Sequence, residues 1–397
     1  MKICLIIDDY MPDSIKVGAK MMHELACTYT EQGHQVTVIT PSPKIKEDTS
    51  ISELDGVTVC RFKSGEIKNI GKIKRAINET LLPYYAGKHL KSYFQQNPHD
   101  LIVYYSPTIF WGRLIKQLKK IWNAPGYLIL RDLFPQWAVD QGLIKQGSII
   151  EKYFRFFEKQ SYSAADTIGL MSNKNLEWFK ETFKTDYNLS VLYNWASNTP
   201  VKSEGNYRKP LGLEEKVVYF YGGNMGHAQD MMNIVRLAIN MRNEKAAHFV
   251  LVGAGDEVEL IKKAIKRDKL TNMTLLPSVS QNEFKQMLAE FDVGLFTLHK
   301  DHSTHNFPGK LLGYMVQELP ILGSINTGND LKPIVEEAGA GLITINGEDK
   351  AFHANALKLL QDDTYRKKMG ANARKLLEKT FSVEAATGQI LMSLGLN

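Results

Sequence analysis

The segment 299–312, with the sequence HKDHSTHNFPGKLL, holds the residues best suited to binding a phosphate group. Pro308 fits the first turn of a helix, and Gly309 allows a ligand to approach the backbone. Lys310 then places a cation where the amino end of a helix already favours negative charge. We therefore predict that Phe307, Pro308, Gly309 and Lys310 bind a diphosphate, with Lys310 acting in catalysis.

The same segment contains three histidines at three-residue spacing, His299, His302 and His305. Such residues can bind a metal, but no group of carboxylates accompanies them. The Asp-x-Asp spacing that commonly holds a divalent ion on a sugar nucleotide does not occur in the sequence. We predict no metal and no cofactor.

A glycine-rich turn, YFYGGNMGHAQ at 219–229, is the second candidate phosphate site. Gly222 and Gly223 can expose backbone amides to a diphosphate, and Asn224 and Gln229 add polar side chains without charge. A tight turn that needs glycine for conformational reasons alone remains the alternative.

Three further signals are weaker. Gly18 lies at the predicted start of a helix, where a ligand could come close to the backbone, although an ordinary loop glycine explains it equally well. Residues 252–258, VGAGDEV, resemble the beginning of a dinucleotide fingerprint but lack its third glycine. Ser278 follows another predicted strand, where backbone groups could contact a base.

Arg131 and Asp132 are two charged residues at the end of an apolar strand. Burial and mutual pairing at such a position can tune reactivity. We predict that they position the acceptor hydroxyl or the sugar, with a structural Arg–Asp pair as the alternative.

These candidates lie on loops of a repeating strand–helix pattern, which is typical of parallel βαβ units. The first set of predicted strands covers 3–8, 35–40, 57–62, 101–106, 127–132, 167–172 and 190–194. The second set covers 217–221, 248–252, 273–276, 293–298, 320–324 and 341–345. The polar stretch between them, 196–210, is interpreted as a linker.

The pattern predicts an α/β protein with two facing Rossmann-like domains. Residues 1–195 would form an N-terminal domain, and residues 211–380 a C-terminal domain; the family resemblance described below implies that the first binds an acceptor and the second a nucleotide sugar. Residues 381–397 are expected to form a helix that crosses back to the N-terminal domain.

The composition is that of a globular protein, with 44% hydrophobic and 23% charged residues in a chain of 397. The amino end carries no signal-peptide pattern, so we expect a cytoplasmic protein. Cys4, Cys27 and Cys60 fit no zinc spacing and are interpreted as buried small hydrophobic residues.

The formal charge of +6 is concentrated in part in the stretch 61–91, where eight Lys and Arg residues accompany two glutamates. Isoleucine, leucine and tyrosine alternate with these charges, a mixture that suits an anionic membrane surface. An amphipathic core helix with a solvated basic face is the alternative. No nucleic-acid motif accompanies the charge, so nucleic acid is not an expected partner.

Together these motifs resemble the retaining glycosyltransferases of family 4, which have the GT-B fold. The opening IIDDYMPDSIKVGAKMMHELACTYTEQGHQVTVIT is similar to the family's first strand, glycine-bearing loop and helix. The segments YGGNMGHAQ, FVLVGAG and FPGKLLGYMVQELPILGS resemble a bacterial branch that builds O-antigen and related polysaccharides. Within that branch, the sequence looks closest to transferases of N-acetyl-L-fucosamine-type sugars.

The resemblance implies transfer from a UDP-sugar to a lipid-linked saccharide acceptor with retention of configuration. Peripheral contact with the anionic inner-membrane surface on its cytoplasmic face would follow. The family's paired glutamates, seven residues apart, fall on His305 and Gly313, so both acids are missing. Glu318 or Glu336 could replace them only if the fold brings either one close.

Two other functions remain open from the sequence. A UDP-N-acetylhexosamine 2-epimerase uses the same two-domain fold and the same donors. A non-catalytic sugar-nucleotide-binding partner would account for the missing glutamates.

Overall fold

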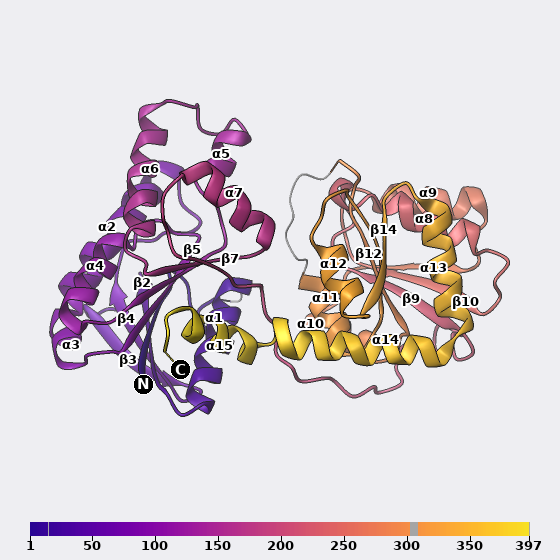
Figure 1. Ribbon diagram of the computed structural model, residues 1–397, viewed down its shortest axis with the longest axis horizontal. Helices are drawn as coiled ribbons and strands as arrows, with labels where there is room; N and C mark the ends of the chain where they lie inside the picture. The colour runs from indigo at the N-terminus through magenta and orange to yellow at the C-terminus, as the bar shows by residue number, and fades with distance from the viewer. Residues whose placement is uncertain (15, 302–308, 397) are drawn as a thin grey trace. The chain divides into compact units, whose positions relative to one another are not determined.

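The computed structural model describes residues 1–14, 16–301 and 309–396, and the chain divides into two compact units (Figure 1). The first unit comprises Met1–Tyr193 together with Val383–Asn397. The second comprises Asn194–Ser382. Each unit has its own sheet and its own hydrophobic core.

The sheet of the first unit has the strand order β3-β4-β2-β1-β5-β6-β7-β8. All neighbours are parallel except β3 and β4, which are antiparallel. The strands are β1 (Lys2–Ile6), β2 (Gln35–Ser42), β3 (Thr49–Leu54), β4 (Val57–Lys63), β5 (Leu101–Ser106), β6 (Gly126–Leu130), β7 (Thr167–Leu170) and β8 (Leu189–Val191).

Strand β3 was not expected from the sequence. It forms a hairpin with β4 through Asp55 and Gly56, whose φ angles of 50° and 79° suit a two-residue turn of this type. The polar sequence TSISEL lies at the edge of the sheet and is largely exposed, so it lacks the apolar run that marks the other strands.

Helices cover both faces of this sheet, and the buried strands therefore read as continuous apolar runs. The helices are α1 (Val17–Glu31), α2 (Lys72–His89), α3 (Lys91–Gln96), α4 (Gly112–Trp122), α5 (Gln136–Asp140), α6 (Ile149–Tyr162), α7 (Asn173–Phe183) and α15 (Val383–Ser393). Every residue of β5 is buried, for example.

The last helix, α15, belongs to the first unit although it follows the second in sequence. It packs against α1, where the Tyr29 hydroxyl donates to the Thr387 carbonyl at 3.3 Å. Gln32 Nε2 donates to Thr387 Oγ1 at 3.0 Å. These contacts attach the carboxyl-terminal residues to the amino-terminal unit.

The second unit has a fully parallel sheet with the order β11-β10-β9-β12-β13-β14. Its strands are β9 (Val217–Gly222), β10 (Ala247–Val252), β11 (Met273–Leu276), β12 (Val293–Thr297), β13 (Ile321–Ile325) and β14 (Gly341–Ile345). The mixed α/β class with two parallel-sheet domains is thus confirmed.

The helical elements of this unit are η1 (His227–Gln229), α8 (Met231–Asn240), α9 (Val258–Asp268), α10 (Gln281–Leu288), α11 (Gly309–Val316), α12 (Leu331–Glu337), α13 (Asp349–Gln361), α14 (Asp363–Leu376) and η2 (Leu377–Phe381). In this sheet the chain proceeds from β9 to β10 and β11 on one side and from β12 to β13 and β14 on the other. The direction therefore changes between β9 and β12, the position where open α/β sheets bind ligands.

Candidate functional site

The loops that follow β9 and β12 meet at the switch point of the second unit. The β9 loop carries Gly223, and the segment after β12 leads into α11, whose second residue is Lys310. A Cβ atom built on Gly223 would lie 3.3 Å from Lys310 Nζ. The structure thus brings together two predicted site residues that are far apart in the sequence.

Lys310 is held by aromatic residues of the neighbouring strands. Its Nζ donates to the Tyr221 hydroxyl at 2.7 Å and lies 3.9 Å from the centre of that ring. The Phe296 ring is at 6.0 Å. Burial lowers the pKa of Lys310 to about 7, because a desolvated ammonium loses hydration that the neutral amine does not need.

The Lys310 side chain keeps some solvent exposure, although its ammonium is packed among apolar atoms. Within residues 1–14, 16–301 and 309–396, no carboxylate forms an ion pair with it. A half-buried cation with a lowered pKa and no anionic partner is the arrangement that an incoming anion would stabilise.

The glycines of the β9 loop pack against backbone. Gly223 has a φ of 131°, and its amide donates to the Val252 carbonyl at 2.9 Å. Gly253, at φ 156°, lies so close that a Cβ atom there would be 1.9 Å from the Gly223 oxygen. The expectation that the Gly223 amide is exposed to a ligand is therefore wrong, because that amide is used in joining the two loops.

Asn224 and Gln229 are joined to each other. Asn224 Nδ2 donates to Gln229 Oε1 at 2.9 Å, and the Gly226 amide donates to the same oxygen at 3.1 Å. The Tyr221 hydroxyl donates to the Asn224 carbonyl. Gln229 thus fixes the shape of the loop, and Tyr221 connects the loop to Lys310.

Tyr221 was missed by the sequence reasoning. Its position directly before two glycines was a signal, since an aromatic residue at the end of a parallel strand borders the switch point. Gly222 is fully engaged in packing as well, because a Cβ atom there would lie 2.2 Å from Phe284 Cε2.

Several polar side chains lie beside these loops. Asn346 Nδ2 donates to Asp230 Oδ2 at 2.9 Å and to the Leu298 carbonyl at 2.7 Å. The rings of His227 and His299 are 4.8 Å apart, so His299 contacts the turn after β9. Ser278 is exposed two residues beyond β11, and none of the hydrogen bonds among the described residues joins it to Lys310.

In the first unit, Arg131 is buried and binds backbone. Its guanidinium donates to the Leu192 carbonyl at 2.7 Å and to the Tyr193 carbonyl at 3.2 Å. Burial lowers the pKa of Arg131 to about 10. These hydrogen bonds link the residue after β6 to the residues directly after β8, so the Arg131 guanidinium stabilises this part of the sheet.

Asp132 is exposed at the carboxyl end of β6, and partial desolvation of its carboxyl raises its pKa. Among the described ion pairs none joins Asp132 to Arg131. Tyr105 lies nearby, and a Cβ atom on Gly18 would be 3.0 Å from its hydroxyl. Gly18 is in the first turn of α1, so its packing against Tyr105 explains the glycine without a ligand.

A cavity of about 280 Å³ opens beside β1 and β4 in the first unit. Its charged lining is mostly paired, since Lys68 forms an ion pair with Asp9 and Arg61 Nε is 3.2 Å from Asp13 Oδ2. Burial raises the pKa of Asp8, which shares this cavity. The cavity is therefore polar but close to neutral.

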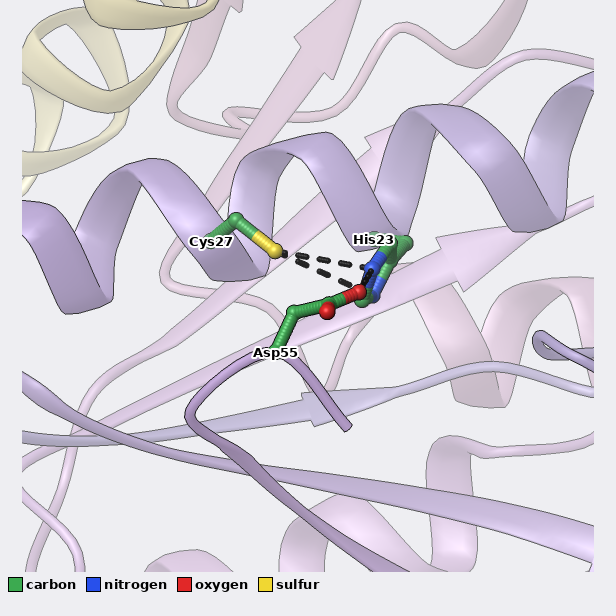
Figure 2. A group of neighbouring side chains, drawn as sticks. All are labelled: His23, Cys27 and Asp55. Atoms are coloured by element: carbon green, nitrogen blue, oxygen red, sulfur yellow. Dashed lines mark hydrogen bonds and ion pairs between the residues drawn. The ribbon is translucent and has the colours of Figure 1, made fainter. Parts of the chain in front are cut away.

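His23, Cys27 and Asp55 form a compact group beneath the β3–β4 turn (Figure 2). His23 Nε2 is 2.9 Å from Asp55 Oδ2, and Cys27 Sγ is 3.5 Å from the same nitrogen. The Tyr10 hydroxyl lies 2.8 Å from His23 Nδ1. Hydrogen bonds on both ring nitrogens account for the position of His23. Cys27 is half-buried rather than fully buried, unlike Cys4 and Cys60.

The second unit is similar to a known protein family. Residues 203–376 match the family described as Glycosyl transferases group 1. This match covers most of the second unit.

Large parts of the chain are also similar to individual proteins. It is 28% identical over 218 residues to the probable glycosyltransferase WbjE of Pseudomonas aeruginosa, a match that covers 54% of each chain and so about half the relative's length. It is 23% identical to the putative colanic acid biosynthesis glycosyl transferase WcaI of Escherichia coli, over 78% of this chain and 80% of that one.

Among solved structures, Alr3699/HepE of Anabaena in complex with UDP superposes with a TM-score of 0.68 at 15% identity. That comparison covers 100% of both chains. Together with the two parallel sheets, it identifies the fold as that of GT-B glycosyltransferases.

The second unit departs from the resembled family at two positions. His305 lies outside the described residues, as do Phe307 and Pro308. Gly313 lies within α11, where a Cβ atom would be 3.0 Å from Leu288 Cδ1. A side chain at this position would require the Leu288 side chain of α10 to shift slightly.

Glu336 does not replace the missing acid. Its Oε1 accepts from Lys332 Nζ and from the Ile343 amide, both at 3.0 Å. This carboxylate therefore links α12 to β14. Gly309 is exposed at the beginning of α11, and among the described residues other than its chain neighbours no atom lies within 4 Å of a Cβ built there.

Proposed function

We propose that this protein is a retaining glycosyltransferase. It would move a sugar from a UDP-sugar to a lipid-linked saccharide acceptor in bacterial polysaccharide synthesis, without a metal or cofactor. The observation that carries the proposal is Lys310, a half-buried cation beside Gly223 at the switch point of the second unit.

The chemistry of Lys310 fits a diphosphate. Its ammonium lies among aromatic rings, and the lowered pKa records the cost of keeping the charge there. A diphosphate would restore full protonation by supplying the missing negative charge. Tyr221 holds the amine in place through its hydroxyl, and phosphate oxygens would bind beside the exposed Gly309.

Lys310 would act mainly in the transition state. As the sugar leaves, negative charge accumulates on the diphosphate, and a preorganised cation stabilises that charge more than it stabilises the intact donor. The bond from the anomeric carbon to the diphosphate oxygen breaks while the acceptor hydroxyl forms the new bond. The acceptor proton passes to the departing phosphate or to solvent.

Asp132 is our candidate for positioning the acceptor hydroxyl. It follows β6 with an exposed carboxyl of raised pKa. A carboxylate in this position can accept a hydrogen bond from an acceptor hydroxyl and orient it. The donor sugar is proposed to be an N-acetylated deoxyhexosamine, which rests on the resemblance of the sequence segments alone.

The acceptor proposal receives support from the relatives, since one is named for colanic acid biosynthesis. A lipid-linked acceptor requires contact with the cytoplasmic face of the inner membrane, and the basic stretch 61–91 is proposed to contribute to it. No described helix is both long and apolar enough to cross a bilayer.

A thermal-shift panel of nucleotides and nucleotide sugars tests the donor proposal. UDP and one UDP-sugar at about 100 times their Kd would stabilise the protein by roughly 2.7 kcal/mol. GDP- and dTDP-sugars serve as controls for the base. A panel in which no UDP compound shifts the melting temperature would contradict the proposal.

A second function, non-catalytic binding of a sugar nucleotide, is favoured by Gly313, which stands where the resembled family has a glutamate. The same panel followed by incubation with radiolabelled donor and membrane-extracted acceptor separates the two. Binding without any labelled lipid product would favour the non-catalytic function.

A further inference from the structure

His23, Cys27 and Asp55 bring three different donor atoms close together in the first unit (Figure 2). A ring nitrogen, a sulfur and a carboxylate oxygen, one from each residue, all lie within 4.8 Å of one another. We propose that this group binds a divalent cation of borderline softness, with Zn²⁺ as the cation that fits it best. The site goes beyond the proposed glycosyl transfer, which uses no metal.

Two of the three ligands come from one face of α1. His23 and Cys27 occur at i and i+4, so their side chains project from successive turns on the same side of the helix. His23 is buried, whereas Cys27 is half-buried. Helix α1 therefore presents an imidazole beside a thiol that is partly open to solvent.

The third ligand comes from the turn between β3 and β4. Asp55 is held there by the hairpin, in which Leu54 pairs with Val57. The turn packs on α1, since a Cβ atom built on Gly56 would lie 3.3 Å from Thr30 Cγ2. The Asp55 side chain is exposed, which gives a cation a path from solvent. Cysteine spacing could not reveal this site, because its oxygen ligand lies on a hairpin that the sequence did not predict.

Both Asp55 and Cys27 approach the same nitrogen of His23. Asp55 Oδ2 is 2.9 Å from Nε2, and Cys27 Sγ is 3.5 Å from it. A catalytic cysteine would instead need its thiol and the carboxylate on opposite ring nitrogens, so that the imidazole accepts a proton from one and is oriented by the other. Donor atoms that surround one point suit a shared cation better than a proton relay.

The separations are close to those of a zinc site. Tetrahedral zinc with its usual bond lengths places neighbouring nitrogen, oxygen and sulfur ligands about 3.3–3.6 Å apart. The distance of 3.5 Å from His23 Nε2 to Cys27 Sγ lies in this range. The distance of 2.9 Å from Nε2 to Asp55 Oδ2 would have to increase slightly, and the exposed Asp55 side chain can rotate to allow this.

The Tyr10 hydroxyl supports the imidazole on its other side. It is buried and lies 2.8 Å from His23 Nδ1. A hydroxyl both donates and accepts hydrogen bonds, so it can hold Nδ1 in either tautomer. When Nε2 binds a cation, Nδ1 carries the ring proton and donates it to Tyr10, as metal-binding histidines commonly do with an outer partner.

Negative charge surrounds the thiol. Burial, followed by the carboxylates of Asp55, Glu31 and Glu24, raises the pKa of Cys27. The same carboxylates that disfavour a free thiolate attract a cation. On binding, the sulfur forms a bond to the metal and the thiol proton passes to solvent.

The set of donor atoms favours zinc over the hard cations. Mg²⁺ and Ca²⁺ take oxygen ligands, whereas one nitrogen, one sulfur and one oxygen suit Zn²⁺. Water would occupy the fourth position of the tetrahedron. Such a site would fasten the β3–β4 turn to α1.

Titration of the untagged full chain with Co²⁺ tests the site, because Co²⁺ takes the place of Zn²⁺ and absorbs light. We expect a thiolate-to-cobalt band in the near ultraviolet that saturates at one Co²⁺ per chain and disappears when Zn²⁺ is added. Competition with a chromophoric chelator measures the affinity for Zn²⁺.

Two variants remove ligands. Cys27→Ser should abolish the cobalt band, and Asp55→Asn should weaken Zn²⁺ binding by about tenfold or more, since even the loss of an outer partner costs about 10–100-fold. Asp48→Asn is the matched control. Asp48 Oδ2 lies 3.2 Å from His89 Nδ1, and its side chain is 71% exposed against 68% for Asp55. The control should bind Zn²⁺ as the wild type does.

Three results would overturn the inference: no cobalt band in the wild type, a band that persists in Cys27→Ser, or the same Zn²⁺ affinity in Asp55→Asn as in the wild type. Zn²⁺ binding without a thiolate band would point instead to other ligands, such as the three histidines in 299–305. Circular dichroism of each metal-free variant monitors folding, and the exposed position of Asp55 keeps the test decisive if Cys27→Ser does not fold. The UDP-sugar thermal shift, recorded without metal, tests the proposed transfer separately.

Discussion

Two polar sites at the carboxyl ends of strands differ in how their charges are balanced. In the first unit, Lys68 is paired with Asp9 and Arg61 with Asp13, so the cavity beside β1 and β4 is nearly neutral. At the switch point of the second unit, Lys310 has an aromatic hydroxyl as its partner and, among the described residues, no carboxylate. The charges of the first site are neutralised internally, whereas no described carboxylate neutralises Lys310 in the second.

This difference bears on the ligands that we propose for the two units. Burying a cation without a counter-ion is costly, and a bound anion removes that cost. A site whose charges are paired internally gains less from an anion but can orient neutral hydroxyl groups through its carboxylates. The charge balance of the two sites therefore agrees with our proposal of a donor diphosphate in the second unit and a saccharide acceptor in the first.

The largest effect is expected for Lys310→Ala. Removing one donor to a developing anionic charge typically costs about 3–4 kcal/mol, or roughly a hundred- to thousandfold in kcat. Steady-state transfer assays and circular dichroism measure turnover and folding. Lys300→Ala is the matched control, because Lys300 is an exposed lysine of the same segment. Unchanged turnover in Lys310→Ala would remove the contrast between the cavity of the first unit and the Lys310 site of the second.

The next effect is the pH dependence of donor affinity. Lys310 has a pKa of about 7 in the free protein, so it is charged below pH 7 and loses its proton above it. Donor affinity should be constant below pH 7 and fall by up to about tenfold per pH unit above it. Isothermal titration calorimetry from pH 6 to 9 measures this.

Lys310→Arg provides the control for this pH series, since a guanidinium stays charged throughout. Its donor affinity should not change with pH. In the ligand-free wild type, the free energy of unfolding should change with pH in the direction opposite to donor affinity. The unfolded chain keeps the lysine proton up to its ordinary pKa, so the contribution of Lys310 to stability rises with pH above 7 and is lost as pH falls through 7. A wild-type affinity that is flat to pH 9 would contradict the assignment of Lys310.

The glycine contacts of the second unit give a smaller effect. Gly253→Ala should destabilise this unit by about 1–3 kcal/mol, because the new Cβ would meet the Gly223 oxygen at a φ of 156°. Denaturant unfolding followed by calorimetry measures the loss. Gly388→Ala, in α15 with no atom within 4 Å, is the control and should be neutral or slightly stabilising. Equal stability of the two variants would show that the loops are not held by this contact.

Much of the fold could be predicted because parallel sheets give local signals. Residues 101–105 are aliphatic or aromatic, and together with Ser106 they form β5 as expected. The edge strand β3 could not be found in this way, since half-exposed polar residues such as those of TSISEL form a strand only by pairing with β4. Asp55-Gly56 was the one local sign of the hairpin.

The site was harder to predict because it depends on strand order. Lys310 was selected from its own segment, but its contact with Tyr221 exists only because β9 and β12 are neighbours. The Gly223 amide donates to Val252 because of the way in which β9 pairs with β10. No local sequence pattern predicts the register of that pairing. Local chemistry thus identified the cation, whereas its surroundings required the structure.

The smallest effect is expected in the first unit, for Asp132→Asn. The exposed carboxylate has no described ion-pair partner, and its removal should leave stability within about 0.5 kcal/mol, as for surface substitutions in general. If Asp132 orients the acceptor hydroxyl, kcat should fall about tenfold while the donor Kd stays constant. Transfer kinetics at saturating donor measure the effect on kcat separately from any effect on stability. Asp140→Asn, on the exposed end of α5, is the control. An unaltered kcat would exclude Asp132 from the reaction, and a weakened donor Kd would mean that the first unit, too, contributes to holding the donor.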